Sequence, residues 1–171
     1  MKPHFAMLAA YNAWCNERIY AAAAQLSDAD YRADRGAFFK SVHGTLNHIL
    51  VADLIWLKRF GVRADAPDRL DAILHDTLAD LRAARIEEDS RIEDWVAGLS
   101  EADLAAPISY RTMVNPAPIS QALGSALMHL FNHQTHHRGQ VHALMTAMEG
   151  RDFAPSLDLI VFQRTTGIGM S

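Results

Sequence analysis

The stretch that decides the fold is residues 119–148, which read ISQALGSALMHLFNHQTHHRGQVHALMTAM. Apolar or small residues recur there at alternating spacings of three and four, a pattern typical of the inward face of a helix. Two histidines occupy positions where this pattern calls for Leu or Ile. The inward-facing series consists of Ile119, Leu123, Ala126, Leu130, His133, His137, Leu144 and Met148, with Gln140 in the interval before Leu144. The segment therefore predicts a long helix with imidazoles on its buried face.

His133 and His137 are four residues apart, so they lie one turn apart and differ by only about 40° around the helix axis. Two imidazoles placed in this way can reach one point, and helical proteins use such pairs to bind metal ions. Three other histidines offer alternatives. His129 also forms an i, i+4 pair with His133, His136 is displaced to the other side of the helix, and His142 points away from His137. The periodicity favours the pair at 133 and 137.

Three further segments have helical periodicity, and short polar or Pro/Gly-containing stretches separate them. They are residues 5–26, 41–60 and 70–99. Four long helical patterns with little strand signal predict an all-α protein, a four-helix bundle that forms a single domain over residues 1–171.

The connections between these helices carry weaker signals. The segment 70–99 has a polar middle at residues 87–91, where we expect a kink or a break. Residues 108–114 are compatible with an extended conformation, and the Asn-Pro-Ala-Pro sequence at 115–118 indicates a turn that leads into the last helix. A short apolar piece at 157–162 is expected to pack back onto the helices.

A divalent-metal centre usually has at least three protein ligands, so the histidine pair needs a partner. The second helical segment supplies one in His48. Gly44 and Ala52 lie one turn before and one turn after it, and their small side chains would leave room for an ion and for a molecule bound to it. His43 is the alternative, although it falls close to the start of the helix. The site is therefore predicted between the second and fourth long helices.

Composition excludes several classes of function. The chain has 171 residues and a formal net charge of −4, with 16 Lys and Arg against 20 Asp and Glu. Because there is no basic surplus to neutralise a phosphate backbone, we expect no nucleic-acid partner. No apolar run approaches the roughly 20 residues that a membrane-spanning helix needs, so we expect no membrane association. A single cysteine excludes an intrachain disulfide and fits a cytoplasmic location.

Three other residues have structural interpretations. Cys15 falls on the apolar stripe of the first helix and is expected to be a small core residue. Asp53 lies about 140° around its helix from His48, which makes a buried cap or salt bridge more plausible than support of that ligand. Arg138 could attract an anionic substrate or pair with Asp53, and we favour the ion pair.

Two sequence segments resemble the signatures of a known family. They are HGTLNHILVAD at residues 43–53, followed by Trp56, and NHQTHHRGQ at residues 132–140. Together with the YNAWCN segment at 11–16 and the region 155–158, they are similar to the DinB/YfiT-like superfamily of metalloenzymes, the damage-inducible family that is unrelated to the DNA polymerase of the same name. The resemblance covers almost the whole chain.

The resemblance implies a four-helix bundle in which three histidines from two helices hold one divalent metal ion. Carried over position by position, the ligands are His48, His133 and His137, in agreement with the periodicity. Members of this superfamily include thiol S-transferases that use bacillithiol or mycothiol, a mycothiol-dependent isomerase and proteins described as metal-dependent hydrolases. Homodimers are common among them, so the resemblance also implies a homodimer.

Three neutral imidazoles leave a coordination position open, which is typical of a catalytic centre. We expect zinc or nickel, with iron, cobalt or manganese as further possibilities, and a low-molecular-weight thiol as a possible second cofactor. The predicted function is a metal-dependent transferase or hydrolase acting on a small-molecule substrate. The alternative is a non-catalytic metal-binding bundle with a structural, sensing or stress-response role. The sequence identifies no catalytic residue beyond the ligands.

Overall fold

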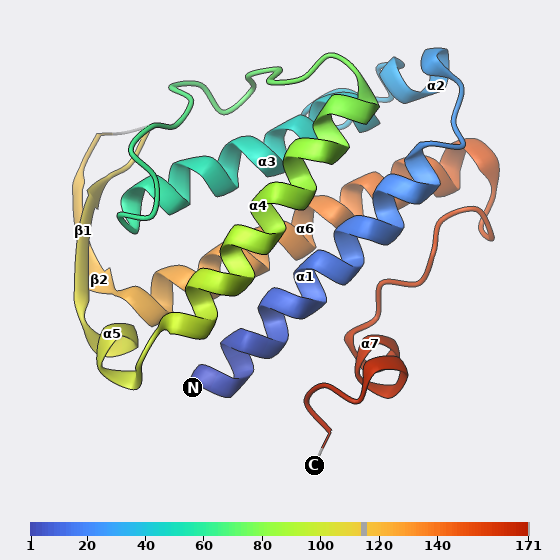
Figure 1. Cartoon of the computed structure of the whole chain (residues 1–171). Helices are drawn as coiled ribbons and strands as arrows, with labels where there is room; N and C mark the ends of the chain where they lie inside the picture. Colours follow the sequence, from blue (N-terminus) through green and yellow to red (C-terminus); the bar gives the residue numbers. More distant parts are fainter. Residues whose placement is uncertain (114–115, 171) are drawn as a thin grey trace.

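Figure 1 shows the computed structural model of the chain, which describes residues 1–113 and 116–170. Four long helices dominate it and lie side by side. They are α1 (Lys2–Ala23), α3 (Val42–Arg59), α4 (Leu78–Gly98) and α6 (Leu123–Glu149). The helix α3 packs along α6, while α1 packs against both α4 and α6. The mainly helical architecture predicted from the sequence is confirmed.

The prediction of an all-α chain needs one correction, because two short strands precede the last long helix. β1 (Pro107–Arg111) pairs antiparallel with β2 (Pro118–Ala122). Residues 119–122 therefore belong to a strand, although the apolar spacing had placed them in the helix. The extended segment expected at 108–114 is found as β1 over residues 108–111, while residues 112 and 113 are not in a strand. Val114 and Asn115 of the predicted strand and turn lie outside the described residues.

Three short helices complete the described part of the chain: α2 (Asp28–Arg32), α5 (Glu101–Ala105) and α7 (Leu159–Thr166). The apolar tail packs back as predicted, with Phe162 almost fully buried against Tyr11 and the buried Cys15. None of the described helices has the length and apolar character that crossing a lipid bilayer requires.

The third helical segment is shorter than predicted. It begins at Leu78 because the Thr77 side chain caps it, accepting a hydrogen bond from the Asp80 backbone N–H at 3.1 Å. Before that cap, the Asn47 side chain accepts hydrogen bonds from the backbone N–H groups of Leu74 and His75 at 2.9 and 3.1 Å. Residues 70–77 are thereby held as a non-helical segment against α3. This segment provides one contact of the site described below.

The expected kink at residues 87–91 is absent, since α4 runs without interruption from Leu78 to Gly98. Its polar residues Arg85, Glu88 and Asp89 are buried. Arg85 and Asp89 face partners on other helices, and Glu88 pairs with Arg63 of the connection before α4. Within 87–91 only Glu88 and Asp89 are buried, so the polar middle is an interior feature in part.

Apolar side chains form two large clusters along the helices. One includes Trp56 and Leu130, and the other includes Leu46, Leu50 and Val141. His133 and His137 follow Leu130 and precede Val141 on α6, so the histidines lie between the two apolar clusters.

Candidate metal centre

The structure brings the three predicted histidines together. His48 comes from α3, and His133 and His137 come from α6. The imidazole centroids are 5.1 Å apart for His48 and His133, 4.5 Å for His48 and His137, and 4.3 Å for His133 and His137. One ring nitrogen from each residue lies within 4.8 Å of the other two. The convergence expected between the second and fourth long helices is thus present, and metal ligation itself stays a prediction.

Hydrogen bonds fix which nitrogen of two rings faces the cluster. The Nδ1 of His48 lies 2.7 Å from the carbonyl oxygen of Leu70. A carbonyl only accepts, so Nδ1 carries the proton and Nε2 keeps its lone pair. The Nδ1 of His137 lies 2.8 Å from the Oε1 of Gln140, and the Nε2 of the same glutamine lies 3.2 Å from His136. An amide oxygen only accepts, so Nδ1 of His137 also carries the proton. Both rings are therefore oriented as metal-binding histidines usually are.

The nitrogen separation fits a shared ion. The Nε2 atoms of His48 and His133 are 3.2 Å apart. Two nitrogens that each lie about 2.0–2.1 Å from a tetrahedral zinc ion are roughly 3.3 Å from each other. Three neutral imidazoles are also a donor set that zinc, nickel, copper or iron accepts. The residues present therefore fit a divalent metal.

The electrostatic surroundings keep these imidazoles neutral. Burial, together with the neighbouring His137, lowers the pKa of His48 to about 4, although the Leu70 carbonyl opposes the shift. Burial and the surrounding histidines lower the pKa of His133 to about 3, and burial lowers the pKa of His137. A proton is a poor competitor for lone pairs in this environment. The three rings thus keep lone pairs that can coordinate one cation.

An aromatic side chain that the sequence analysis did not consider covers one side of the cluster. The Phe39 ring stacks on the His48 ring at a centroid distance of 3.6 Å and an interplanar angle of 16°, and meets His137 edge-on. A Cβ at Gly44 would lie 2.1 Å from the Phe39 carbonyl oxygen. The small residue at 44 therefore admits the Phe39 backbone, which corrects the expectation that it leaves space for an ion.

The other histidines lie outside the three-residue group. His43 binds the His75 carbonyl through Nε2 at 3.2 Å, a structural role near the start of α3. His136 is exposed, and His142 contacts Thr146 on its own helix. His129 lies next to Trp56, with ring centroids 5.0 Å apart.

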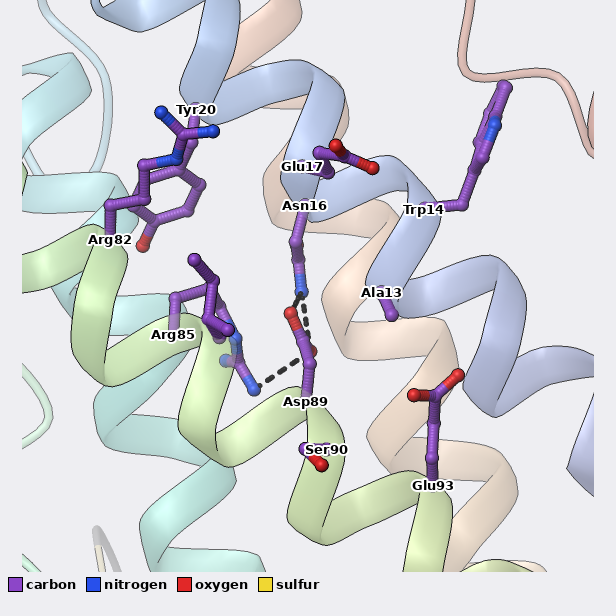
Figure 2. A pocket seen from close by; sticks show the side chains of 11 residues that line it. Ala13, Trp14, Asn16, Glu17, Tyr20, Arg82, Arg85, Asp89, Ser90 and Glu93 are labelled. Atoms are coloured by element: carbon purple, nitrogen blue, oxygen red, sulfur yellow. Dashed lines mark hydrogen bonds and ion pairs between the residues drawn. The ribbon is translucent and has the colours of Figure 1, made fainter.

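A buried polar network lies behind the cluster. Asp53 pairs with Arg85 of α4 at 2.6 Å and accepts a hydrogen bond from Gln134, the residue that follows His133. The Nη2 of Arg85 lies 3.0 Å from Asp89 without hydrogen-bond alignment, and Asp89 accepts from Asn16 of α1 at 2.9 Å (Figure 2). The network ties α1, α3, α4 and α6 together around the helix that carries two of the histidines.

The ion pair proposed between Arg138 and Asp53 is wrong, because Arg85 takes that position. Arg138 instead donates to the side-chain oxygens of Asn12 and Asn16 and to that of Gln134. It is 2% exposed, so its role is structural, as favoured from the sequence. The sequence did not indicate this burial, since charged residues on a helix usually face solvent.

Two hollows differ in what they offer chemically. The pocket in Figure 2, about 480 Å³ between α1 and α4, is lined by residues such as Trp14, Arg82 and Glu93 and contains none of the histidines. A second pocket of about 620 Å³ has His48 and His133 in its wall. Two of the three histidines of the candidate metal centre therefore border a cavity of the size that small molecules occupy.

These features define a mainly helical protein with a three-histidine cluster compatible with metal binding. The chain belongs to the DinB family, whose family model matches residues 1–152. It is similar to Protein DinB of Bacillus subtilis (strain 168), with 27% identity over 143 residues that cover 79% of this chain and 80% of that protein. The resemblance stated from the two histidine segments is confirmed at the level of the family.

Proposed function

We propose that this chain is a metal-dependent enzyme that acts on a small molecule by thiol S-transfer or hydrolysis. In this proposal the four long helices form a four-helix bundle, and the Nε2 atoms of His48, His133 and His137 hold one divalent ion. Zinc and nickel are the first candidates for the ion, followed by iron, cobalt and manganese. Membership of the DinB family and the convergence of the three rings support the proposal.

The observation that carries it is the combination of the cluster with the adjoining pocket. Among the described residues, the group contains three histidines and no fourth His, Cys, Asp or Glu. His48 and His133 also form part of the pocket wall. A structural zinc site is normally closed by a fourth protein ligand, whereas a catalytic site keeps one position for water or substrate. The open side favours catalysis over the alternative of a non-catalytic metal-binding bundle.

In the proposed reaction the ion and the residues around it would have separate roles. A bound divalent ion would supply the positive charge that converts a thiol or a water molecule into a nucleophile near neutral pH. The Leu70 carbonyl and Gln140 hold His48 and His137 with Nε2 toward the centre. The stacked Phe39 ring excludes water from one side of His48.

The experiment that tests this function is a screen for turnover. Protein purified without an affinity tag is reconstituted with zinc or nickel and assayed with low-molecular-weight thiols against electrophilic acceptors, and with ester or amide substrates. We expect activity in the wild-type protein and in His142→Ala, and its loss in His133→Ala. Equal rates in the wild type and in His133→Ala would contradict catalysis at this centre.

The remaining expectations stay proposals. The family resemblance supports a homodimer, and the single cysteine supports a cytoplasmic location. Light scattering of the purified protein tests the first, and fractionation of the source cells tests the second.

A further inference from the structure

The pocket beside the metal centre has a second chemically distinct end. His48 and His133 line one part of it, and Trp56, Arg59 and Tyr110 line another. His48 and Trp56 are eight residues apart on α3, which corresponds to about 12 Å along the helix axis. The pocket is thus long enough to hold a small molecule with one end at the histidines and the other near Trp56.

Two aromatic rings and a backbone carbonyl contact Arg59 at this distant end. Its guanidinium lies 4.5 Å from the centroid of the Trp56 ring and 4.7 Å from that of the Tyr110 ring. Its Nη2 donates a hydrogen bond to the backbone carbonyl of Arg111 at 3.1 Å. The two rings contact each other edge-on, with centroids 5.1 Å apart, so the guanidinium lies beside both of them. These contacts and the hydrogen bond to Arg111 restrict its position, while its remaining N–H donors lie along its edges.

No carboxylate neutralises this guanidinium in the described part of the chain. Five other arginines form ion pairs with partners at 3.0 Å or less: Arg32, Arg35, Arg63, Arg69 and Arg85. No Asp or Glu oxygen among residues 1–113 and 116–170 lies within 4.0 Å of Arg59. Burial lowers the pKa of Arg59, as expected for a cation that has lost water without gaining an anion.

Among the described residues, the wall around Arg59 also contains no acidic group. The lining residues comprise histidines, apolar and aromatic side chains, and neutral polar groups, with Arg59 as the one permanently charged member. Between the two ends the wall combines the apolar Ala52 and Ile55 of α3 with His129 of α6, whose ring lies 5.0 Å from that of Trp56 and 5.9 Å from that of His133. Gln121 and the Tyr110 hydroxyl, which are joined by a hydrogen bond of 3.0 Å, add neutral polar groups near Arg59.

We propose that this pocket binds an organic acid whose carboxylate pairs with Arg59, whose apolar body lies along Ala52, Ile55 and Trp56, and whose opposite end faces His48 and His133. The identity of that end as the reacting group depends on the proposed function, whereas the carboxylate site does not. The substrate class is therefore an amphipathic monocarboxylate with a thiol or an electrophilic centre several bonds from the acid.

A carboxylate fits this site better than a phosphate ester. Arginine pairs with both through its planar fork. A phosphate monoester carries close to two negative charges at pH 7 and has three oxygens to satisfy. The described wall offers it one cation, which matches the charge of a single carboxylate.

The test measures binding to the metal-free protein, so that its outcome does not depend on the metal centre. Octanoate, octanamide and octyl phosphate are titrated into the protein and followed by NMR chemical shifts. We expect octanoate to bind at least tenfold more tightly than octanamide, because a charge-assisted bond contributes about that much. Arg59→Gln should remove this preference, and Arg59→Lys should keep part of it.

Arg18 provides a matched control. Its guanidinium lies 4.5 Å from the centroid of the Trp14 ring and it donates to the Ser156 carbonyl. It therefore shares with Arg59 a tryptophan contact and a bond to a backbone carbonyl, but it lies outside the pocket. Arg18→Gln should leave the octanoate affinity within twofold of the wild type. Equal binding of octanoate and octanamide, or an unchanged octanoate affinity in Arg59→Gln, would overturn the proposal. Octyl phosphate binding tenfold more tightly than octanoate would replace the carboxylate with a phosphate and overturn it as well.

A second titration separates this inference from the proposed function. We expect 8-mercaptooctanoate to bind more tightly than octanoate to protein loaded with zinc, and equally tightly to metal-free protein. If the thiol gives no gain with zinc while Arg59→Gln still weakens octanoate, the carboxylate site stands and the thiol chemistry at the histidines is refuted.

Discussion

Arg85 is the residue whose removal tests the buried network most severely. It is 1% exposed, its Nη1 lies 2.6 Å from Asp53, and its Nη2 lies 3.0 Å from Asp89. Arg85→Met keeps an unbranched apolar side chain but leaves two buried carboxylates without their cation. Breaking a buried pair in this way costs about 3–5 kcal/mol.

For a chain of this size, 1 kcal/mol corresponds to a shift of about 2–4 °C in Tm. We therefore expect Arg85→Met to unfold roughly 6–20 °C below the wild type in a thermal scan, with a matching loss in urea titrations. Arg82→Met is the control, because Arg82 lies on the same helix but is exposed. It should change the free energy of unfolding by about 0.5 kcal/mol or less.

The pH dependence of the stability lost in Arg85→Met gives a second test of the buried network. Burial raises the pKa of Asp53 to about 6, and Arg85 opposes that rise. Without Arg85 the pKa rises further, so the folded variant takes up a proton that the unfolded chain, with an Asp pKa near 3.9, does not. The difference in stability between variant and wild type should therefore shrink as the pH falls from 8 to 5. A variant as stable as Arg82→Met at pH 8, or a difference that grows on acidification, would refute the role given to the network.

Three further outcomes follow from the site. Gln140→Leu, which removes the acceptor for the Nδ1–H of His137, should weaken zinc binding about 10- to 100-fold in a chelator competition, and an unchanged affinity would show that this bond does not orient the ring. The free energy of unfolding of the metal-free wild type should fall as the pH falls from 7 to 4, because histidine in the unfolded chain is protonated near pH 6.5 while the pKa of folded His48 is about 4. Urea titrations at several pH values should show that the free energy of unfolding of His48→Gln depends less steeply on pH. An equally steep pH dependence would count against the lowered pKa of His48. Gly44→Ala should destabilise the protein by about 1–3 kcal/mol, because its methyl group would lie 2.1 Å from the Phe39 carbonyl oxygen. Gly139→Ala is the control: a Cβ there would meet nothing within 4 Å, so the change should be neutral or stabilise by up to about 1 kcal/mol. Equal thermal unfolding of the two variants would contradict the close contact at Gly44.

The sequence predicted the convergence of the histidines because helical spacing is a strong signal. His133 and His137 are one turn apart, and His48 falls on a helix that is apolar over most of its circumference. These positions depend only on local periodicity and on the packing of two long helices. Both conditions hold in the structure.

The parts that sequence reasoning missed depend on non-local contacts. Residues 119–122 keep the apolar spacing of the following helix, but they pair with β1, and spacing alone does not distinguish the two outcomes. Residues 70–77 have helical spacing, yet the side chains of Asn47 and Thr77 direct the backbone otherwise. For that reason the Leu70 carbonyl, which orients His48, could not be predicted.

The buried charges were missed for a related reason. Arg85 and Asp89 are four residues apart on α4, a spacing that usually indicates a solvated pair on an outer helix face. Their burial depends on Asp53 and on the asparagines of α1, which lie 32 and more residues away in the sequence. Only the three-dimensional arrangement shows that these groups are paired with one another.

The most direct test of the central claim is the metal content of tag-free protein after incubation with zinc or nickel and removal of excess metal, measured by elemental analysis. We expect close to one equivalent in the wild type and in His142→Ala, and severe loss in His137→Ala. Less than about a tenth of an equivalent in the wild type, or equal loss in both variants, would contradict a metal centre at His48, His133 and His137.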